Sequence, residues 1–126
     1  MGAKSTQGRR TPWPSTDGFI VTDAGLETWL VLGRGIELPA FAAYPLAASP
    51  EGRALLVEYY EHYVAIAHTH GAGTLLDTPT WRANPHWAST LGDDRTTLAE
   101  LISASVRVRH DVRSRWAGDQ PFLIGG

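Results

Sequence analysis

The sequence predicts an α/β fold in which short strands alternate with long helices. Three apolar segments, at 18–22, 74–77 and 121–124, are short enough to be buried strands. Between them lie segments that carry helix start signals and apolar residues at helical spacing. Because short apolar strands joined by helical connections are typical of right-handed βαβ units, we expect the strands to run parallel to one another.

The first expected strand follows a polar N-terminal stretch. Residues 1–17 have no apolar segment of the kind found in secretory signals, and we expect a flexible tail there rather than a transit peptide. The strand at 18–22 enters a turn at 23–25, and the apolar spacing of 26–32 then predicts a short helix. The segment 38–46 contains two prolines and has no clear period, so we expect a loop.

A long helix is predicted to start at Ser49, where serine can cap free amides, Pro50 fits the first turn and Glu51 complements the helix dipole. It should end between His68 and His70, before glycines that lead into the second strand. Its apolar residues near one face are Leu55, Tyr59, Tyr63, Ile66 and Ala67.

After the second strand, we expect a loop at 78–85 and a helical turn at 87–91. The second long helix should reach Trp116. Its cap can be any of three residues: Asp93, Asp94 or Thr96. Its expected core stripe is Leu98, Leu101, Ile102, Ser105, Val106 or Val108, Val112 and Trp116. Four arginines interrupt this stripe, and we expect them on a solvated face rather than in a phosphate site: Arg107, Arg109, Arg113 and Arg115.

Composition excludes several function classes. The 126 residues suffice for one domain, and a formal charge of −2 gives no electrostatic basis for binding nucleic acid or an anionic membrane. No apolar segment approaches the roughly 20 residues that cross a bilayer, so we expect a cytoplasmic protein. The chain has no cysteine, which removes disulfides, thiolate metal ligands and a cysteine nucleophile.

The best candidate site lies where the expected strands end, because parallel sheets bind ligands at the carboxyl ends of their strands. Asp23 and Asp77 each follow an apolar strand directly. A carboxylate there can hold an ammonium group, and small residues beside it can offer backbone N–H groups to a substrate carboxylate. Both aspartates can equally cap turns and helix starts, and the spacing alone leaves the two interpretations open.

The remaining polar residues give weaker signals. His68 and His70 are two residues apart and do not share a helical face, so we expect no metal site among the histidines. No nucleophile elbow, Gly-rich dinucleotide motif or phosphate-binding loop is present, and we assign no catalytic residue. Arg82 follows Trp81 and can either contact a ligand carboxylate or stack on the indole for structural reasons.

Two segments resemble the homocysteine S-methyltransferase family. Residues 19–30, Phe-Ile-Val-Thr-Asp-Ala-Gly-Leu-Glu-Thr-Trp-Leu, are similar to its first strand and the turn that follows. Residues 72–81, Ala-Gly-Thr-Leu-Leu-Asp-Thr-Pro-Thr-Trp, are similar to its second strand, and 122–126 to its third. Ala24 stands where the family usually has glycine, and Pro79 where it usually has asparagine.

This resemblance implies a fold, an activity and a cofactor. The fold would be a partial (β/α)8 TIM barrel, comprising about the first three strands with their helices over residues 18–126. The activity would be transfer of a methyl group to the thiol of homocysteine, for methionine synthesis, at a zinc ion held by three cysteines. By analogy, the substrate-binding residues would be Asp23, Ala24, Gly25, Asp77, Thr78 and Thr80.

Since the chain lacks the zinc-binding cysteines, we expect an N-terminal fragment of such an enzyme that binds no zinc and is inactive alone. A full barrel takes about 250 residues, so a partial one would leave sheet edges unpaired. The alternative function is a non-catalytic binding or assembly module that self-associates through those edges. The sequence does not identify the methyl donor or the exact thiol acceptor.

Overall fold

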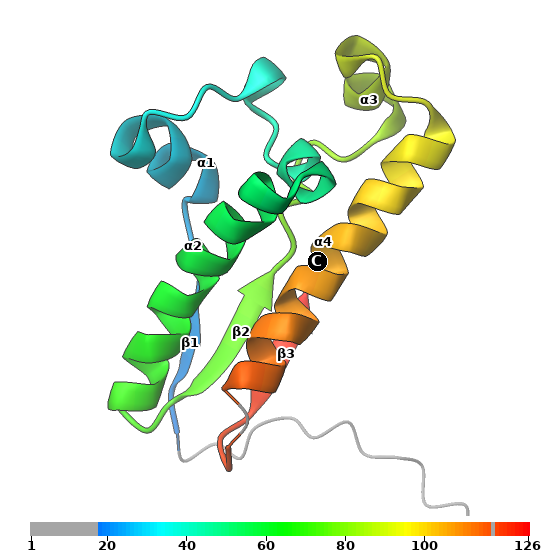
Figure 1. Cartoon of the computed structure of the whole chain (residues 1–126). Helices are drawn as coiled ribbons and strands as arrows, with labels where there is room; N and C mark the ends of the chain where they lie inside the picture. The colour runs from blue at the N-terminus through cyan, green and yellow to red at the C-terminus, as the bar shows by residue number, and fades with distance from the viewer. Residues whose placement is uncertain (1–17, 117) are drawn as a thin grey trace, which may run out of the picture.

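The computed structural model describes residues 18–116 and 118–126, so the expected tail at 1–17 lies outside the described residues. Strands β1 (Ile20–Thr22), β2 (Gly73–Asp77) and β3 (Phe122–Gly125) form one sheet in the order β1-β2-β3. Both strand pairs are parallel, as the sequence pattern indicates. The carboxyl ends of all three strands therefore lie at the same end of the sheet (Figure 1).

The expected partial TIM barrel is wrong. The described residues form a small mixed α/β domain, dominated by helix, whose sheet has three short strands and two open edges. The barrel was inferred from motifs at the strand ends, and such motifs determine only how each strand turns into the next segment. Closure into a barrel depends on strand number, tilt and stagger across the whole sheet, which these local motifs do not encode.

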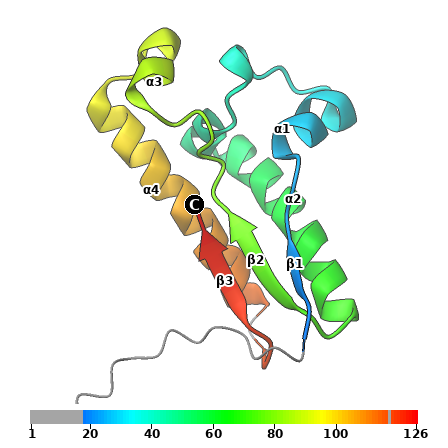
Figure 2. The ribbon, with the colours of Figure 1, turned by 180° about the vertical axis from the view of Figure 1, so that it is seen from behind.

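Two long helices cover one face of the sheet (Figures 1 and 2). Helix α2 (Pro50–Thr69) begins as predicted, with the Ser49 hydroxyl accepting a hydrogen bond from the Gly52 N–H at 3.0 Å. Helix α4 (Arg95–Arg115) is capped by Asp94, whose carboxylate accepts from the Thr97 N–H at 2.7 Å. That bond lowers the pKa of Asp94 and selects it among the three candidate caps.

Shorter elements gather around the carboxyl ends of the strands (Figure 1). These are α1 (Leu26–Thr28), the π-helical turn η1 (Trp29–Gly33), the 3-10 turns η2 (Pro39–Phe41) and η3 (Tyr44–Ala48), and α3 (Pro85–Leu91). The segment expected to be a loop thus contains two short turns. The turn expected at 87–91 is longer by two residues, because the Asn84 side chain caps its start.

The buried stripe of α2 differs from the predicted one by a small rotation. The side chains that are buried are Leu56, Tyr59, Tyr60, Val64 and Ala67, whereas Ile66 is 40% exposed. The turn η3 packs closely against the start of α2. A Cβ added at Gly52 would collide with the carbonyl group of Leu46, so only glycine allows this approach.

The two faces of the sheet have different surroundings. Thr74 and Leu76 of β2 are buried beneath the helices, while Leu75 points the other way and is only partly buried. Figure 2 shows that face, over which the described residues place no helix. None of the described helices is long and apolar enough to cross a bilayer.

Candidate functional site

The structure brings Asp23 and Asp77 together at the carboxyl ends of β1 and β2. One oxygen of the Asp23 carboxylate, Oδ1, accepts a hydrogen bond from the Asp77 N–H at 2.8 Å. The other, Oδ2, accepts from the Tyr59 hydroxyl at 3.2 Å. The Asp23 side chain therefore continues the ladder between the two strands beyond Thr22, and it also fixes the position of Asp77.

Burial raises the pKa of the Asp23 carboxyl, and hydrogen bonds from Asp77 and Tyr59 oppose this rise. The charge of Asp77 raises the pKa of Asp23 further. The hydroxyl of Tyr59 has its pKa raised by burial and then by the Asp23 charge, so it remains a hydrogen-bond donor. The Asp77 carboxylate, by contrast, is exposed at the end of its strand.

Ala24 and Gly25 lie next to this pair, at the turn between β1 and α1. Both are exposed, and the Tyr63 hydroxyl donates to the carbonyl oxygen of Ala24 at 2.9 Å. Gly25 has a φ of 73°, in the left-handed region that favours glycine. The turn is thus held by its backbone geometry and by α2, which leaves its outer surface accessible.

A buried arginine supports the end of β2 from below. Arg109 has no exposed surface; its Nε donates to the Asp77 carbonyl oxygen at 2.9 Å and its Nη2 to the Tyr60 hydroxyl at 2.5 Å. Tyr60 donates to the same carbonyl oxygen at 2.9 Å, and the guanidinium lies 4.4 Å from the centre of its ring. Burial lowers the pKa of Arg109 and raises that of Tyr60.

The prediction that Arg109 lies on a solvated face is therefore wrong. On α4, Leu101, Ser105, Val108 and Val112 are buried at helical spacing around it. Position 109 falls inside that stripe, whereas the prediction treated all four arginines of this segment as one solvated, dipole-complementing face. The hydrogen-bond acceptors at the end of β2 make its burial possible.

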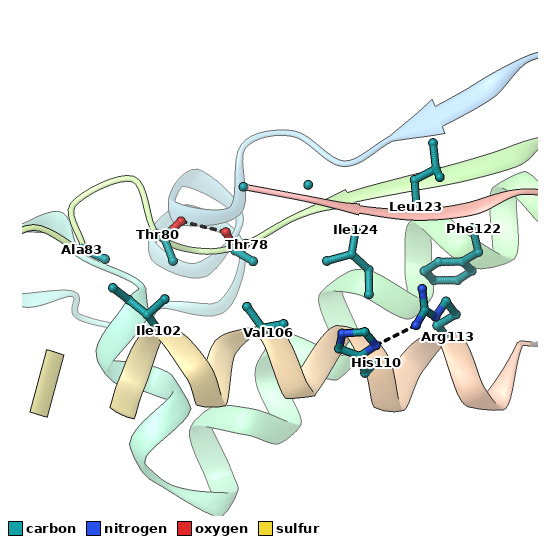
Figure 3. Close-up of a pocket in the computed structure, with 12 residues that line it drawn as sticks. Thr78, Thr80, Ala83, Ile102, Val106, His110, Arg113, Phe122, Leu123 and Ile124 are labelled. Carbon is teal, nitrogen blue, oxygen red and sulfur yellow. Dashed lines mark hydrogen bonds between the residues drawn. The ribbon is translucent and has the colours of Figure 1, made fainter. Parts of the chain in front are cut away.

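Thr78 and Thr80 line a groove between β3 and α4, next to the end of β2 (Figure 3). Their hydroxyl oxygens are 2.7 Å apart and hydrogen-bonded to each other. The groove has a volume of about 730 Å³, and Gly125 and Gly126 also line it. A Cβ at Gly125 would come within 2.5 Å of an oxygen of the Asp77 carboxylate, so a larger residue there would displace that side chain.

The six predicted substrate-binding residues therefore divide into two groups. Asp23, Ala24, Gly25 and Asp77 lie together around the ends of β1 and β2. The two threonines line the neighbouring groove. The sequence left open whether Arg82 contacts a ligand or stacks on an indole. Its guanidinium stacks between two indoles, 4.5 Å from the ring centre of Trp81 and 4.1 Å from that of Trp87. Its Nη1 donates to the Ala40 carbonyl at 2.7 Å, which gives it a structural role.

The residues of this site do not fit the zinc ion of the homocysteine S-methyltransferases. The chain has no cysteine, and within 18–116 and 118–126 no three histidine or acidic side chains converge as a metal would require. Two carboxylates beside accessible backbone have instead the chemistry to interact with a cationic group. No protein-family model, curated protein or solved structure matches the chain.

Proposed function

We propose that the ends of β1 and β2 bind the amino-acid end of homocysteine or a related thiol, as part of methyl transfer to that thiol in the cytoplasm. The observation that carries this proposal is the juxtaposition of Asp23 and Asp77, one partly buried and one exposed. An ammonium group above the turn would interact with both carboxylates. In this proposal the described residues bind and orient the substrate and supply no catalytic group.

Preorganisation of Asp77 supports the proposal. Its N–H is bonded to Asp23, and its carbonyl oxygen accepts from both Tyr60 and Arg109. The backbone of Asp77 is therefore fixed before any ligand arrives, while its carboxylate stays in water. Binding would then cost little further ordering of the protein, which favours recognition of a small ligand.

Titration of the full chain with L-homocysteine, followed by amide chemical shifts, tests this proposal. We expect shifts at residues 23–25 and 77, and none with 4-mercaptobutanoate, which lacks the ammonium group. Asp77→Asn should weaken binding about tenfold, as expected for loss of a charged partner. Asp111→Asn, an exposed control on α4, should bind like the wild type. Equal affinity for 4-mercaptobutanoate, or an unaffected Asp77→Asn variant, would reject the site.

The methyl-transfer part of the proposal has a separate assay. The chain is incubated with zinc, homocysteine and a betaine or methylated-sulfur donor, and methionine is measured. Because the chain supplies no thiolate zinc ligand, we expect no methionine above a protein-free control. Formation at enzyme-like rates would show that catalytic groups are present after all.

A second candidate function, self-association through sheet edges, is favoured by exposed apolar side chains. Phe19, beside the open edge of β1, is 86% exposed, and Leu32 is 81% exposed. Sedimentation over a range of concentrations tests this candidate. A dimer that Phe19→Ser dissociates would support it, whereas a monomer at all concentrations would exclude it.

A further inference from the structure

The groove between β3 and α4 is long relative to an amino acid. Along α4 its lining extends from Ile102 to Arg113, a difference of 11 positions, or about 16 Å at the rise of an α-helix. Along the sheet it follows β3 and the residue after it, from Phe122 to Gly126 (Figure 3). An extended chain covers this length with about five residues. The dimensions fit a peptide segment rather than a small metabolite.

β3 offers an unpaired backbone edge to this groove. On its paired side, the Pro121 carbonyl oxygen accepts from the Thr74 N–H of β2 at 2.8 Å. The Gly125 carbonyl oxygen accepts at 3.2 Å from the N–H of Thr78, the residue after β2. In a parallel ladder, alternate residues bond to the same neighbour. The backbone groups of Phe122 and Ile124 therefore face the opposite edge, where the described residues place no strand.

The groove has an apolar middle and a basic end. Ile102, Val106 and Ile124 form its apolar walls (Figure 3). At the end near the start of β3, an Arg113 Nη2 lies 2.8 Å from the His110 Nδ1, and both side chains are exposed. In the described part of the chain, Arg113 forms no ion pair with a carboxylate. A carboxylate on a partner would complement this cation.

We propose that this groove binds an extended peptide segment of a partner protein, which adds to β3 as a fourth strand. Its alternate side chains would be apolar and face α4, and a carboxylate would reach Arg113. A second copy of this chain is a poorer occupant. Asp23, which follows β1, accepts hydrogen bonds from the Asp77 N–H and the Tyr59 hydroxyl of its own chain, and β3 contains no acidic residue. This proposal is independent of the amino-acid site at Asp23 and Asp77.

The test uses the full chain and an acetylated, amidated peptide, Val-Thr-Val-Thr-Glu, with calorimetry and amide chemical shifts as readouts. We expect the largest shifts at Phe122 and Ile124. Replacing the glutamate of the peptide with lysine should weaken binding at least about tenfold, the effect of losing a charge-assisted hydrogen bond. N-methylation of alternate peptide amides should abolish binding, because it blocks pairing with the strand edge.

A charge reversal in the protein makes the test specific. Arg113→Glu should prefer the lysine peptide to the glutamate peptide, whereas Arg107→Glu, an exposed change outside the groove, should keep the wild-type preference. Equal affinity for both peptides, or unchanged binding of the N-methylated peptide, would overturn the proposal. The proposal would also be overturned if the chain bound no peptide and formed a dimer that Arg113→Glu dissociates. That result would place a second copy in the groove.

Discussion

Arg109 and Arg113 lie one turn apart on α4, yet their surroundings have little in common. Arg109 has no exposed surface and donates to the Asp77 carbonyl oxygen and the Tyr60 hydroxyl. Arg113 is exposed and contacts only the ring of His110 among the hydrogen bonds of the described residues. The difference lies in what faces each side chain: the Asp77 carbonyl oxygen and the Tyr60 hydroxyl give Arg109 acceptors inside the core.

Truncating each arginine in turn should give the largest contrast. Arg109→Ala removes a large buried side chain and two hydrogen bonds, so we expect the free energy of unfolding to fall by about 3 kcal/mol. Arg113→Ala should change it by less than about 0.5 kcal/mol, as for most surface positions. Urea denaturation of both variants measures the difference. Similar losses in the two variants would contradict the comparison.

Removing one hydroxyl sharpens the comparison at the level of a single bond. Tyr60→Phe deletes the group that accepts from Arg109 and donates to Asp77, and leaves a buried cationic donor without a partner. We expect a loss of about 2 kcal/mol in the free energy of unfolding. Tyr63→Phe is the matched control, because its hydroxyl bonds an exposed carbonyl at Ala24, where water can replace it. A smaller loss for Tyr60→Phe than for this control would show that Arg109 finds other acceptors.

The smallest effect concerns the pH dependence of stability. Burial raises the folded-state pKa of Asp23 above its ordinary 3.8, so the folded state holds the proton more tightly than the unfolded state. The stability that this carboxyl contributes is therefore complete below about pH 3.8 and is lost as the pH rises through the raised value. Between pH 4 and 7 the wild type should lose stability relative to Asp23→Asn, by less than about 1 kcal/mol. Urea denaturation at each pH measures the free energies of unfolding of the two proteins. A difference between them that does not change with pH, or that changes in the opposite direction, would contradict a raised pKa for Asp23.

Local signals in the sequence predicted much of the local structure. Ser49 and Asp94 start their helices because a side-chain oxygen beside free amides acts over a few residues. The parallel pairing was predicted from apolar strands joined by helices. It places Asp23 and Asp77 side by side at the carboxyl ends of their strands. Closure of the sheet was mispredicted, because it depends on contacts between distant segments.

In the candidate site, too, features that depend on local sequence were predicted, and features that depend on contacts between distant segments were not. The strand-end residues were found from their position after apolar segments, but the groove was not, since it depends on how α4 lies along β3. Arg109 was missed because its burial requires the carbonyl group of Asp77, which is 32 residues away. General burial preferences take no account of such a specific acceptor, and by those preferences arginine is expected at the surface.

The central position of β2 has a consequence for how the molecule opens. Gly73 and Thr74 donate to opposite neighbours, Phe19 and Pro121, and Thr78 donates to Gly125. The Asp77 N–H donates to the side chain of Asp23, so this amide is also protected from exchange, although it lies beyond the backbone ladder with β1. Amide hydrogens along β2 should consequently exchange with deuterium more slowly than those of β1 and β3, making the strand that carries Asp77 the last to unfold.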